Sequence, residues 1–245
     1  MYEKRSYRDL FENKLTWFEV SVGETDLMVG CSADLQKETL REVRRLRKSL
    51  DSFIRLHPEF STSLVPLSYE DANGIIRDME QAGIKAGTGP MAAVAGAIAM
   101  HIANRLREHS TEVFVENGGD LYIYSEEDRL IGIHAGQSVL SGKFAIRVKK
   151  CQLPMGVCTS SATVGHSLSF GKADAATVLS RDGALSDALA TALCNRIQGK
   201  NDLGPALEWV RSIEGVSGAM AVMGDTMGAV GDIELVPWNR KEEES

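Results

Sequence analysis

The sequence predicts an α+β protein in which antiparallel sheets carry paired helices on one face. Strand-like runs come in groups instead of alternating singly with helices, as they would in a parallel βαβ series. The hydrophobic fraction of 43% and the charged fraction of 25% are those of an ordinary globular protein. A chain of 245 residues can bury a sizeable core. We expect a single domain over 1–245, or two intimate α+β subdomains.

An antiparallel hairpin followed by a helix is expected at the start of the chain. β-rich runs at Trp17–Val22 and Asp26–Cys31 flank Gly23-Glu24-Thr25, where glycine accepts the positive φ of a hairpin turn. Asp34 offers an N-cap for a helix that continues to about Ile54. The letters S-Y-E-D from Ser68 predict a second helical region, and an Ala-rich run with little charge predicts a buried third helix. That third helix spans Met91–Arg107 and is interrupted by Gly96.

The rest of the chain predicts a meander, then two helices and further strands. The four meander strands are Glu112–Asn117, Leu121–Tyr124, Leu130–Ala135 and Phe144–Lys149. The later elements are helices at Leu185–Ile197 and Gly204–Ile213 and strands at Gly218–Met223 and Asp232–Val236.

Charge and hydropathy exclude two classes of partner. The net charge of −7 disfavours a nucleic acid. The basic stretch Arg41–Lys48 has Leu40, Val43, Leu46 and Leu50 at helical spacing, which predicts the solvated face of an amphipathic helix. No run approaches the roughly 18 apolar residues of a membrane span, and the N-terminus lacks a signal-peptide core. We therefore expect no membrane partner and a cytoplasmic location.

The four cysteines, Cys31, Cys151, Cys158 and Cys194, have no C-x-x-C pair and no histidines at zinc spacing. This distribution predicts reduced core thiols. Cys158 lies in a polar segment, so a role as a nucleophile is an alternative.

Gly87-Thr88-Gly89-Pro90-Met91-Ala92 fits the G-x-G-x-x-A pattern of a dinucleotide-binding turn. That function needs a buried strand directly before it, whereas the preceding residues predict a helix. A turn with Pro90 at the first helical position explains the same letters.

Glu116-Asn117-Gly118-Gly119-Asp120 lies between two predicted strands. Paired glycines allow a plain type I′-like hairpin. They also leave backbone N–H groups uncovered for an anion. Both interpretations remain open at this point.

Hydroxyls, glycines, His166, Lys172 and Asp174 crowd the segment Met155–Val178. Hydroxyls can bind phosphate or ribose oxygens, and a histidine can act as a general base near neutral pH. A long polar loop that satisfies its own backbone is the alternative. The candidate ligand-binding residues here are Ser160, Ser161, Thr163, Gly165, Ser167 and Lys172, and the candidate base is His166.

Asp187 and Thr191 are four residues apart at the start of a predicted helix, and therefore lie on one face. A carboxylate and a hydroxyl suit Mg²⁺, which takes few protein ligands and keeps several waters. An N-terminal Asp favoured by the helix dipole is the alternative.

Together these residues resemble the ApbE family, and more closely a branch of that superfamily known as conserved hypothetical proteins. The segments that carry the resemblance are L-D-S-F-I-R-L-H-P-E-F-S-T-S, A-A-V-A-G-A-I-A, E-N-G-G-D and S-D-A-L-A-T-A-L, of which the last two are specific. The resemblance covers about Leu46–Val236 and implies a tunnelling-fold-like α+β architecture.

Characterised members of the ApbE family are FAD:protein FMN transferases, so the resemblance implies Mg²⁺ and FAD as ligands. It implies that Asp187 and Thr191 bind the metal, which would neutralise the FAD diphosphate. It also implies that Asn117, Gly118, Gly119 and Asp120 bind the cofactor, in a cleft formed by this turn, the loop from Gly165 to Asp174 and the Asp187 helix. A hydroxyl of an acceptor protein would then attack the FMN-side phosphorus and release AMP.

Two departures from the family pattern leave the activity open. Ala95 precedes Gly96 where typical transferases carry Lys-Gly, and G-H-S-L-S-F-G-K-A-D stands where they carry His-x-x-Asp-Pro-x-Thr-Gly. A different loop implies a different substrate. The leading hypothesis is an Mg²⁺-dependent flavin or nucleotide enzyme, and the alternative is a non-catalytic flavin- or nucleotide-binding protein. A homo-oligomer is compatible with both.

Overall fold

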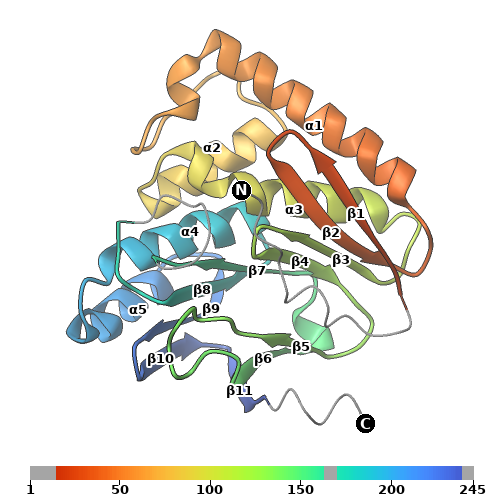
Figure 1. Cartoon of the computed structure of the whole chain (residues 1–245). Helices are drawn as coiled ribbons and strands as arrows, with labels where there is room; N and C mark the ends of the chain where they lie inside the picture. Colours follow the sequence, from red (N-terminus) through yellow and green to blue (C-terminus); the bar gives the residue numbers. More distant parts are fainter. Residues whose placement is uncertain (1–14, 163–169, 239–245) are drawn as a thin grey trace.

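The computed structural model describes residues 15–162 and 170–238, and it confirms the predicted α+β class (Figure 1). All strand pairs in this part of the chain are antiparallel. The large sheet consists, in spatial order, of β1 (Thr16–Val22), β2 (Thr25–Cys31), β3 (Val113–Asn117), β4 (Asp120–Tyr124), β7 (Met155–Ser160), β8 (Ala175–Ser180), β9 (Val216–Met223) and β10 (Thr226–Gly231). The small sheet has the order β11 (Glu234–Pro237), β6 (Phe144–Val148), β5 (Arg129–Gly132).

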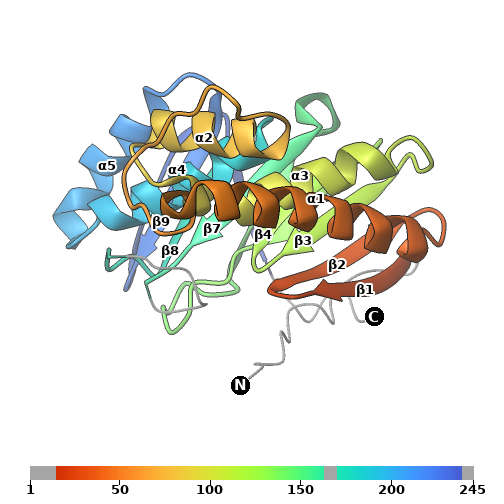
Figure 2. The same ribbon diagram turned by 90° about the horizontal axis from the view of Figure 1, so that it is seen from above.

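The helices lie together on one face of the large sheet, as predicted, and the small sheet lies on the other (Figures 1 and 2). The α-helices are α1 (Gln36–Leu56), α2 (Ile75–Ala86), α3 (Val94–Leu106), α4 (Gly183–Arg196) and α5 (Leu203–Arg211). Short 3₁₀ turns include η2 (Pro58–Ser61) and η3 (Pro90–Ala93), of which the second leads directly into α3. The described chain therefore forms three layers, with the large sheet in the middle.

Strand β7 is buried on both faces because it lies in the middle layer. Met155 and Val157 point into the apolar cluster under the small sheet, whereas Cys158 belongs to the cluster under the helices. Gly156 faces α4 so closely that an added Cβ would lie 3.0 Å from the Gly183 Cα. The pleat of a single strand thus separates two cores.

The expectation of a polar loop over Met155–Val178 is wrong at both of its ends, which form β7 and the first four residues of β8. Alanine, serine and threonine there are buried in the sheet, where neighbouring strands satisfy the backbone. The four meander strands and the antiparallel pairs β3–β4 and β5–β6 are confirmed. A continuous meander is wrong, because β4 pairs with β7 while β5 and β6 join the small sheet. Strand β10 was not predicted.

Two helix starts differ from the predictions. The second helix begins at Ile75 instead of Ser68, because Gly74 has φ +51°, which a helix cannot contain, and the Tyr69 N–H donates to the Glu80 carboxylate. At α1 the N-cap is Leu35, although Asp34 Oδ1 still accepts from the Gln36 N–H at 3.1 Å.

Helix α1 has the predicted amphipathic pattern, with Val43, Leu46 and Leu50 buried. Among the described residues no single helix is long and apolar enough to cross a membrane. Only α2 taken together with the run Pro90–Leu106 meets those criteria, and the two are bent by 106°.

The four cysteines are free thiols. Three of them are buried as predicted, whereas Cys151 is exposed.

Candidate functional site

The glycine-rich segment before α3 is a turn between helices and not a dinucleotide-binding loop. Gly87, at φ +73°, is the C-cap of α2, and Pro90 is the first residue of η3. A helix precedes this segment, so the strand that a Rossmann unit requires is not there. The turn interpretation is confirmed.

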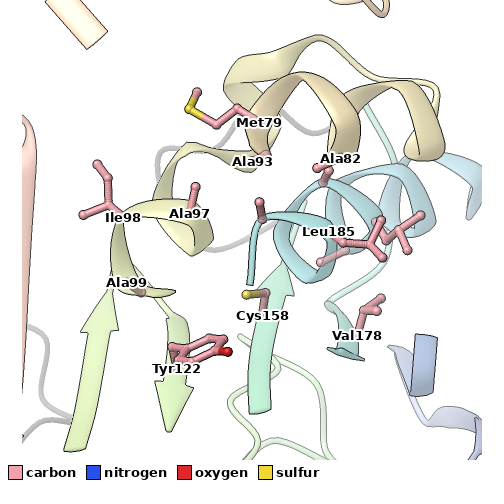
Figure 3. Packing of buried hydrophobic residues seen from close by; sticks show 14 of the residues in the cluster. Met79, Ala82, Ala93, Ala97, Ile98, Ala99, Tyr122, Cys158, Val178 and Leu185 are labelled. Atoms are coloured by element: carbon pink, nitrogen blue, oxygen red, sulfur yellow. The ribbon is translucent and has the colours of Figure 1, made fainter. Parts of the chain in front are cut away.

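Helices α3 and α4 cross at two glycines. A Cβ on Gly96 would lie 2.2 Å from the Gly183 oxygen, and a Cβ on Gly183 would lie 2.7 Å from the Gly96 oxygen. No side chain fits at either position. The crossing therefore brings the first turn of α3 against the beginning of α4, above the cluster that contains Cys158, Ala97 and Leu185 (Figure 3).

Asp187 caps the neighbouring helix instead of its own. The N-cap of α4 is Asp182, whose Oδ1 accepts from the Leu185 N–H at 3.1 Å. Asp187 is only 9% exposed, and its Oδ2 accepts the Gly96 N–H at 2.8 Å. The same carboxylate accepts from the Ala95 N–H. These N–H groups belong to the first turn of α3, which has no side-chain cap at its own N-cap residue. The alternative of a dipole-favoured Asp at the start of α4 is therefore wrong.

The Asn117–Asp120 segment is a two-residue hairpin turn. Asn117 pairs with Asp120, and Gly118 and Gly119 have φ values of +70° and +105°. The Gly119 N–H donates to Glu116 Oε1 at 2.7 Å, so this donor is already used within the turn. The hairpin interpretation is confirmed, and an anion at this turn would have to displace the Glu116 carboxylate.

The two ends of the hairpin hold polar side chains beneath the α3–α4 crossing. Asn117 Nδ2 donates to the Ala95 oxygen at 3.1 Å. Asp120 Oδ1 accepts the Thr159 N–H of β7 at 3.2 Å, and Asp120 is 7% exposed. The hairpin is thereby tied both to the first turn of α3 and to the end of β7.

Asp120 and Asp187 form a buried acidic pair. Burial, with a smaller contribution from the Glu116 charge, raises the pKa of Asp120 to about 7, although hydrogen bonds from the Thr159 N–H and Cys158 act in the opposite direction. Burial also raises the pKa of Asp187 well above its usual value, and the Asp120 charge adds to that effect. Within the described residues no ion pair joins either carboxylate to a basic side chain. Two such groups ionise together only if a cation compensates their charge.

Cys158 lies beside this pair and is not an activated thiol. It is 1% exposed, and its Sγ is 3.7 Å from the Gly183 oxygen. Burial raises the pKa of Cys158 well above its usual value, and the charges of Asp120 and Asp187 raise it further. A nucleophilic cysteine needs the opposite environment, so the Cys158 alternative has no structural support.

Ser160 follows Cys158 by two residues and so lies on the same, helix-facing side of β7. It is 4% exposed, and its Oγ has no hydrogen-bond partner in the part of the chain that the structure describes. Leaving a buried hydroxyl unpaired costs about 1–3 kcal/mol. A bound ligand or an ordered water would supply the missing partner.

The structure gathers several predicted site residues at one place and leaves others apart. Asn117, Asp120 and Asp187 lie at the α3–α4 crossing or directly beneath it. Ser160 lies on the helix-facing side of β7, and Thr191 is half-buried one helical turn beyond Asp187. Ser161 is buried at the end of β7, whereas Lys172 is exposed and its backbone N–H donates to the Ile197 oxygen. The remaining predicted residues lie outside the described residues, and they are Thr163, Gly165, His166 and Ser167.

Sequence reasoning missed the backbone at the centre of the site. The Ala95–Gly96 peptide has no reactive side chain, and Gly183 was not recognised as a contact residue. The signal for both was the small residue inside or at the start of a helix, which marks close approach of another element.

A divalent cation fits the donors that this site offers. The described residues contain no cluster of three or more His, Cys, Asp or Glu side chains that could hold a metal ion. Mg²⁺ takes few protein ligands and keeps several waters. The residues that would hold Mg²⁺ are Asp187 and Thr191, with Asp120 close enough to add charge.

The fold and the site together define an α+β protein with a buried pair of carboxylates under two crossing helices. The family model described as "AbpE bacteria" matches residues 8–211. The chain therefore belongs to this family, and the predicted resemblance to the ApbE superfamily is confirmed.

Relatives and solved structures agree with this assignment. The chain is 38% identical to a UPF0280 protein of Methanocaldococcus jannaschii, over 92% of this chain and 96% of that one. It is 40% identical to a UPF0280 protein of Methanocella arvoryzae, with 88% of each chain covered. The fold matches the apo flavinyl transferase ApbE of Pseudomonas stutzeri with a TM-score of 0.52 and 17% identity, over 94% and 96% of the two chains. It matches the ApbE protein of Thermotoga maritima with a TM-score of 0.55 and 14% identity, over 87% and 96%.

Proposed function

We propose that this chain is an Mg²⁺-dependent enzyme acting on a flavin dinucleotide, and that it transfers FMN to a Ser or Thr hydroxyl of an acceptor protein. The observation that carries the proposal is the buried pair of Asp120 and Asp187. The Ser160 hydroxyl, buried without a partner in the described residues on the helix-facing side of β7, supports it. Family membership and the fold shared with flavin transferases support the same direction.

Each residue has a definite task in this proposal. Bound Mg²⁺ would neutralise diphosphate charge at the site. Asp187 and Thr191 hold the cation through their oxygens, and Ser160 donates its hydroxyl hydrogen to a phosphate or ribose oxygen. The buried surroundings exclude water and strengthen these interactions.

The group transfer makes one bond and breaks one. The acceptor hydroxyl oxygen forms a bond to the FMN-side phosphorus, and the phosphoanhydride bond breaks. AMP leaves with the electron pair of that bond. The hydroxyl proton passes to a general base, for which His166 is the proposed residue.

AMP release tests the proposal. The wild-type chain incubated with FAD, Mg²⁺ and Ser- or Thr-containing acceptors releases AMP, as measured by chromatography, and labels the acceptor with flavin. Asp187→Asn abolishes release, whereas Asp182→Asn is the matched control because Asn also caps a helix well. No AMP release together with no FAD binding by calorimetry contradicts the proposal.

A second function is favoured by Ala95, which stands where typical transferases carry lysine. In this alternative the protein binds a flavin or nucleotide without turnover. FAD then binds with Mg²⁺ dependence, AMP is not released with any acceptor, and His166→Ala leaves FAD affinity unchanged.

A further inference from the structure

One peptide group at the start of α3 is held at both of its polar ends. Its oxygen belongs to Ala95 and accepts from Asn117 Nδ2 at 3.1 Å. Its N–H belongs to Gly96 and donates to Asp187 Oδ2 at 2.8 Å. Asn117 comes from the β3–β4 hairpin and Asp187 from α4, so three separate parts of the chain meet at this peptide.

We propose that Asn117 is a positioning residue that orients the Asp187 carboxylate through the Ala95–Gly96 peptide, and does not itself contact the flavin or nucleotide. The inference rests on the proposed function, because it concerns the cation site that Asp187 would form. It replaces the sequence-based expectation that Asn117 binds the cofactor directly.

Planarity of the peptide bond links the position of the Ala95 oxygen to that of the Gly96 N–H. The Ala95 oxygen and the Gly96 hydrogen point in opposite directions within one rigid plane. Rotating the plane to follow one partner moves the other atom away from its partner. The peptide lies within α3, whose backbone hydrogen bonds already set its orientation. Asn117 and Asp187 each add a partner at one of its two polar ends.

The tight helix crossing also prevents this peptide from shifting toward α4. Gly96 cannot shift toward α4, because the Gly183 oxygen already occupies the space where a Cβ would be. The Asp187 Cβ lies 2.7 Å from the same position. The carboxylate thus accepts two backbone N–H groups of α3, those of Ala95 and Gly96, which fix its position against the helix.

Hydrogen bonding also transmits the effect. A donor on a peptide oxygen polarises the group and strengthens the bond that its N–H donates, because the two bonds are cooperative. Asn117 therefore strengthens the Gly96–Asp187 bond as well as orienting it. Second-layer partners of this kind commonly cost 10–100-fold in metal affinity when removed.

The test measures Mn²⁺ affinity by electron paramagnetic resonance on the full-length chain. Asn117→Leu, which cannot donate, is expected to weaken Mn²⁺ binding about 10-fold or more. It is expected to leave the metal-free affinity for FAD unchanged. Asn117→Ser, which is too short to reach the Ala95 oxygen, serves if the leucine variant does not fold. The matched control is Asn104→Leu on the exposed side of α3, where the lost bond is the one to Tyr124.

The Gly96 amide proton provides a readout that needs no metal. In nuclear magnetic resonance spectra both Asp187→Asn and Asn117→Leu are expected to shift this resonance upfield, and Asn104→Leu is not. A wild-type chain that binds no Mn²⁺ contradicts the proposed function, and the Gly96 shift then decides the peptide coupling alone. An unmoved Gly96 resonance, unchanged Mn²⁺ affinity in Asn117→Leu, or loss of metal-free FAD affinity in that variant overturns the inference.

Discussion

The two faces of strand β7 have opposite chemical character, apolar toward the small sheet and polar toward the helices. Toward the small sheet, Met155 and Val157 pack with Leu179 in a cluster of apolar side chains. Toward the helices, Cys158 lies near the buried carboxylates of Asp120 and Asp187, an arrangement that costs free energy in the absence of a cation. The face toward the small sheet therefore stabilises the fold through apolar burial. The face toward the helices lowers stability, because it buries the carboxylates of the candidate site.

Asp187→Asn should have the largest effect on the helix-facing side. The amide keeps the shape but loses the charge, so Mn²⁺ affinity falls by at least about 100-fold, since residues that only support a metal ligand already cost 10–100-fold. Thermal denaturation without metal should show little loss of stability, because a buried charge is removed. Calorimetric titration that finds unchanged Mn²⁺ affinity would contradict a metal role for this face.

Leu179→Ala should have the converse effect on the other face. Removing a fully buried leucine leaves a cavity and lowers the free energy of unfolding by about 2–5 kcal/mol. Mn²⁺ affinity of the folded fraction should stay at the wild-type value. Urea denaturation and metal titration of the same sample measure both quantities, and a joint loss would mean that the two faces are not separable.

Gly96→Ala probes the crossing that holds the helix-facing side together. The added Cβ would lie 2.2 Å from the Gly183 oxygen, so the helices must separate at a cost of about 1–3 kcal/mol. Ala normally favours helices over Gly. A variant more stable than the wild type in urea denaturation would show that the helices do not cross as described.

The acidic pair should make stability depend on pH in a specific direction. The pKa of Asp120 is raised from 3.8 to about 7 in the folded chain. The folded state therefore binds more protons than the unfolded state between these values, and stability falls as pH rises from about 4 through about 7. Asp120→Asn should flatten this part of the curve, measured in a chelator. Saturating Mg²⁺ should reverse it, because the cation binds the ionised form.

Thiol labelling changes no residue and compares the accessibility of two cysteines, Cys151 and Cys158. In the native protein iodoacetamide should modify the exposed Cys151 and leave Cys158 unmodified. Peptide mass spectrometry of the labelled chain separates the two sites. Selective labelling of Cys158 would mean that its surroundings are not the buried, acidic ones described.

The fold class was predictable because long periodic segments dominate it. The N-terminal hairpin and α1 follow directly from alternating and 3.6-residue patterns. Strands β7 and β8 were missed because their small and hydroxyl residues, such as Gly156 and Thr177, have loop-like composition. Their burial comes from two covering layers, and a local pattern does not contain that information.

The site was predictable in its side chains and not in its backbone. Asp187 and the Asn117–Asp120 turn were named from residue type and spacing. Their meeting point, the Ala95–Gly96 peptide, has ordinary letters and becomes visible only when α3, α4 and the hairpin are in place. Asp182 was also not predicted. It caps the start of α4, where the sequence had offered Asp187 as an acidic residue favoured by the helix dipole.

A crystal of the protein grown with MnCl₂ and ADP tests the central claim most directly, through the anomalous scattering of manganese. The account predicts a single strong peak at about 2.1–2.2 Å from an Asp187 carboxylate oxygen and the Thr191 hydroxyl, close to the octahedral spacing of Mg²⁺. A peak bound elsewhere, or well-ordered nucleotide with no peak at Asp187, would contradict it.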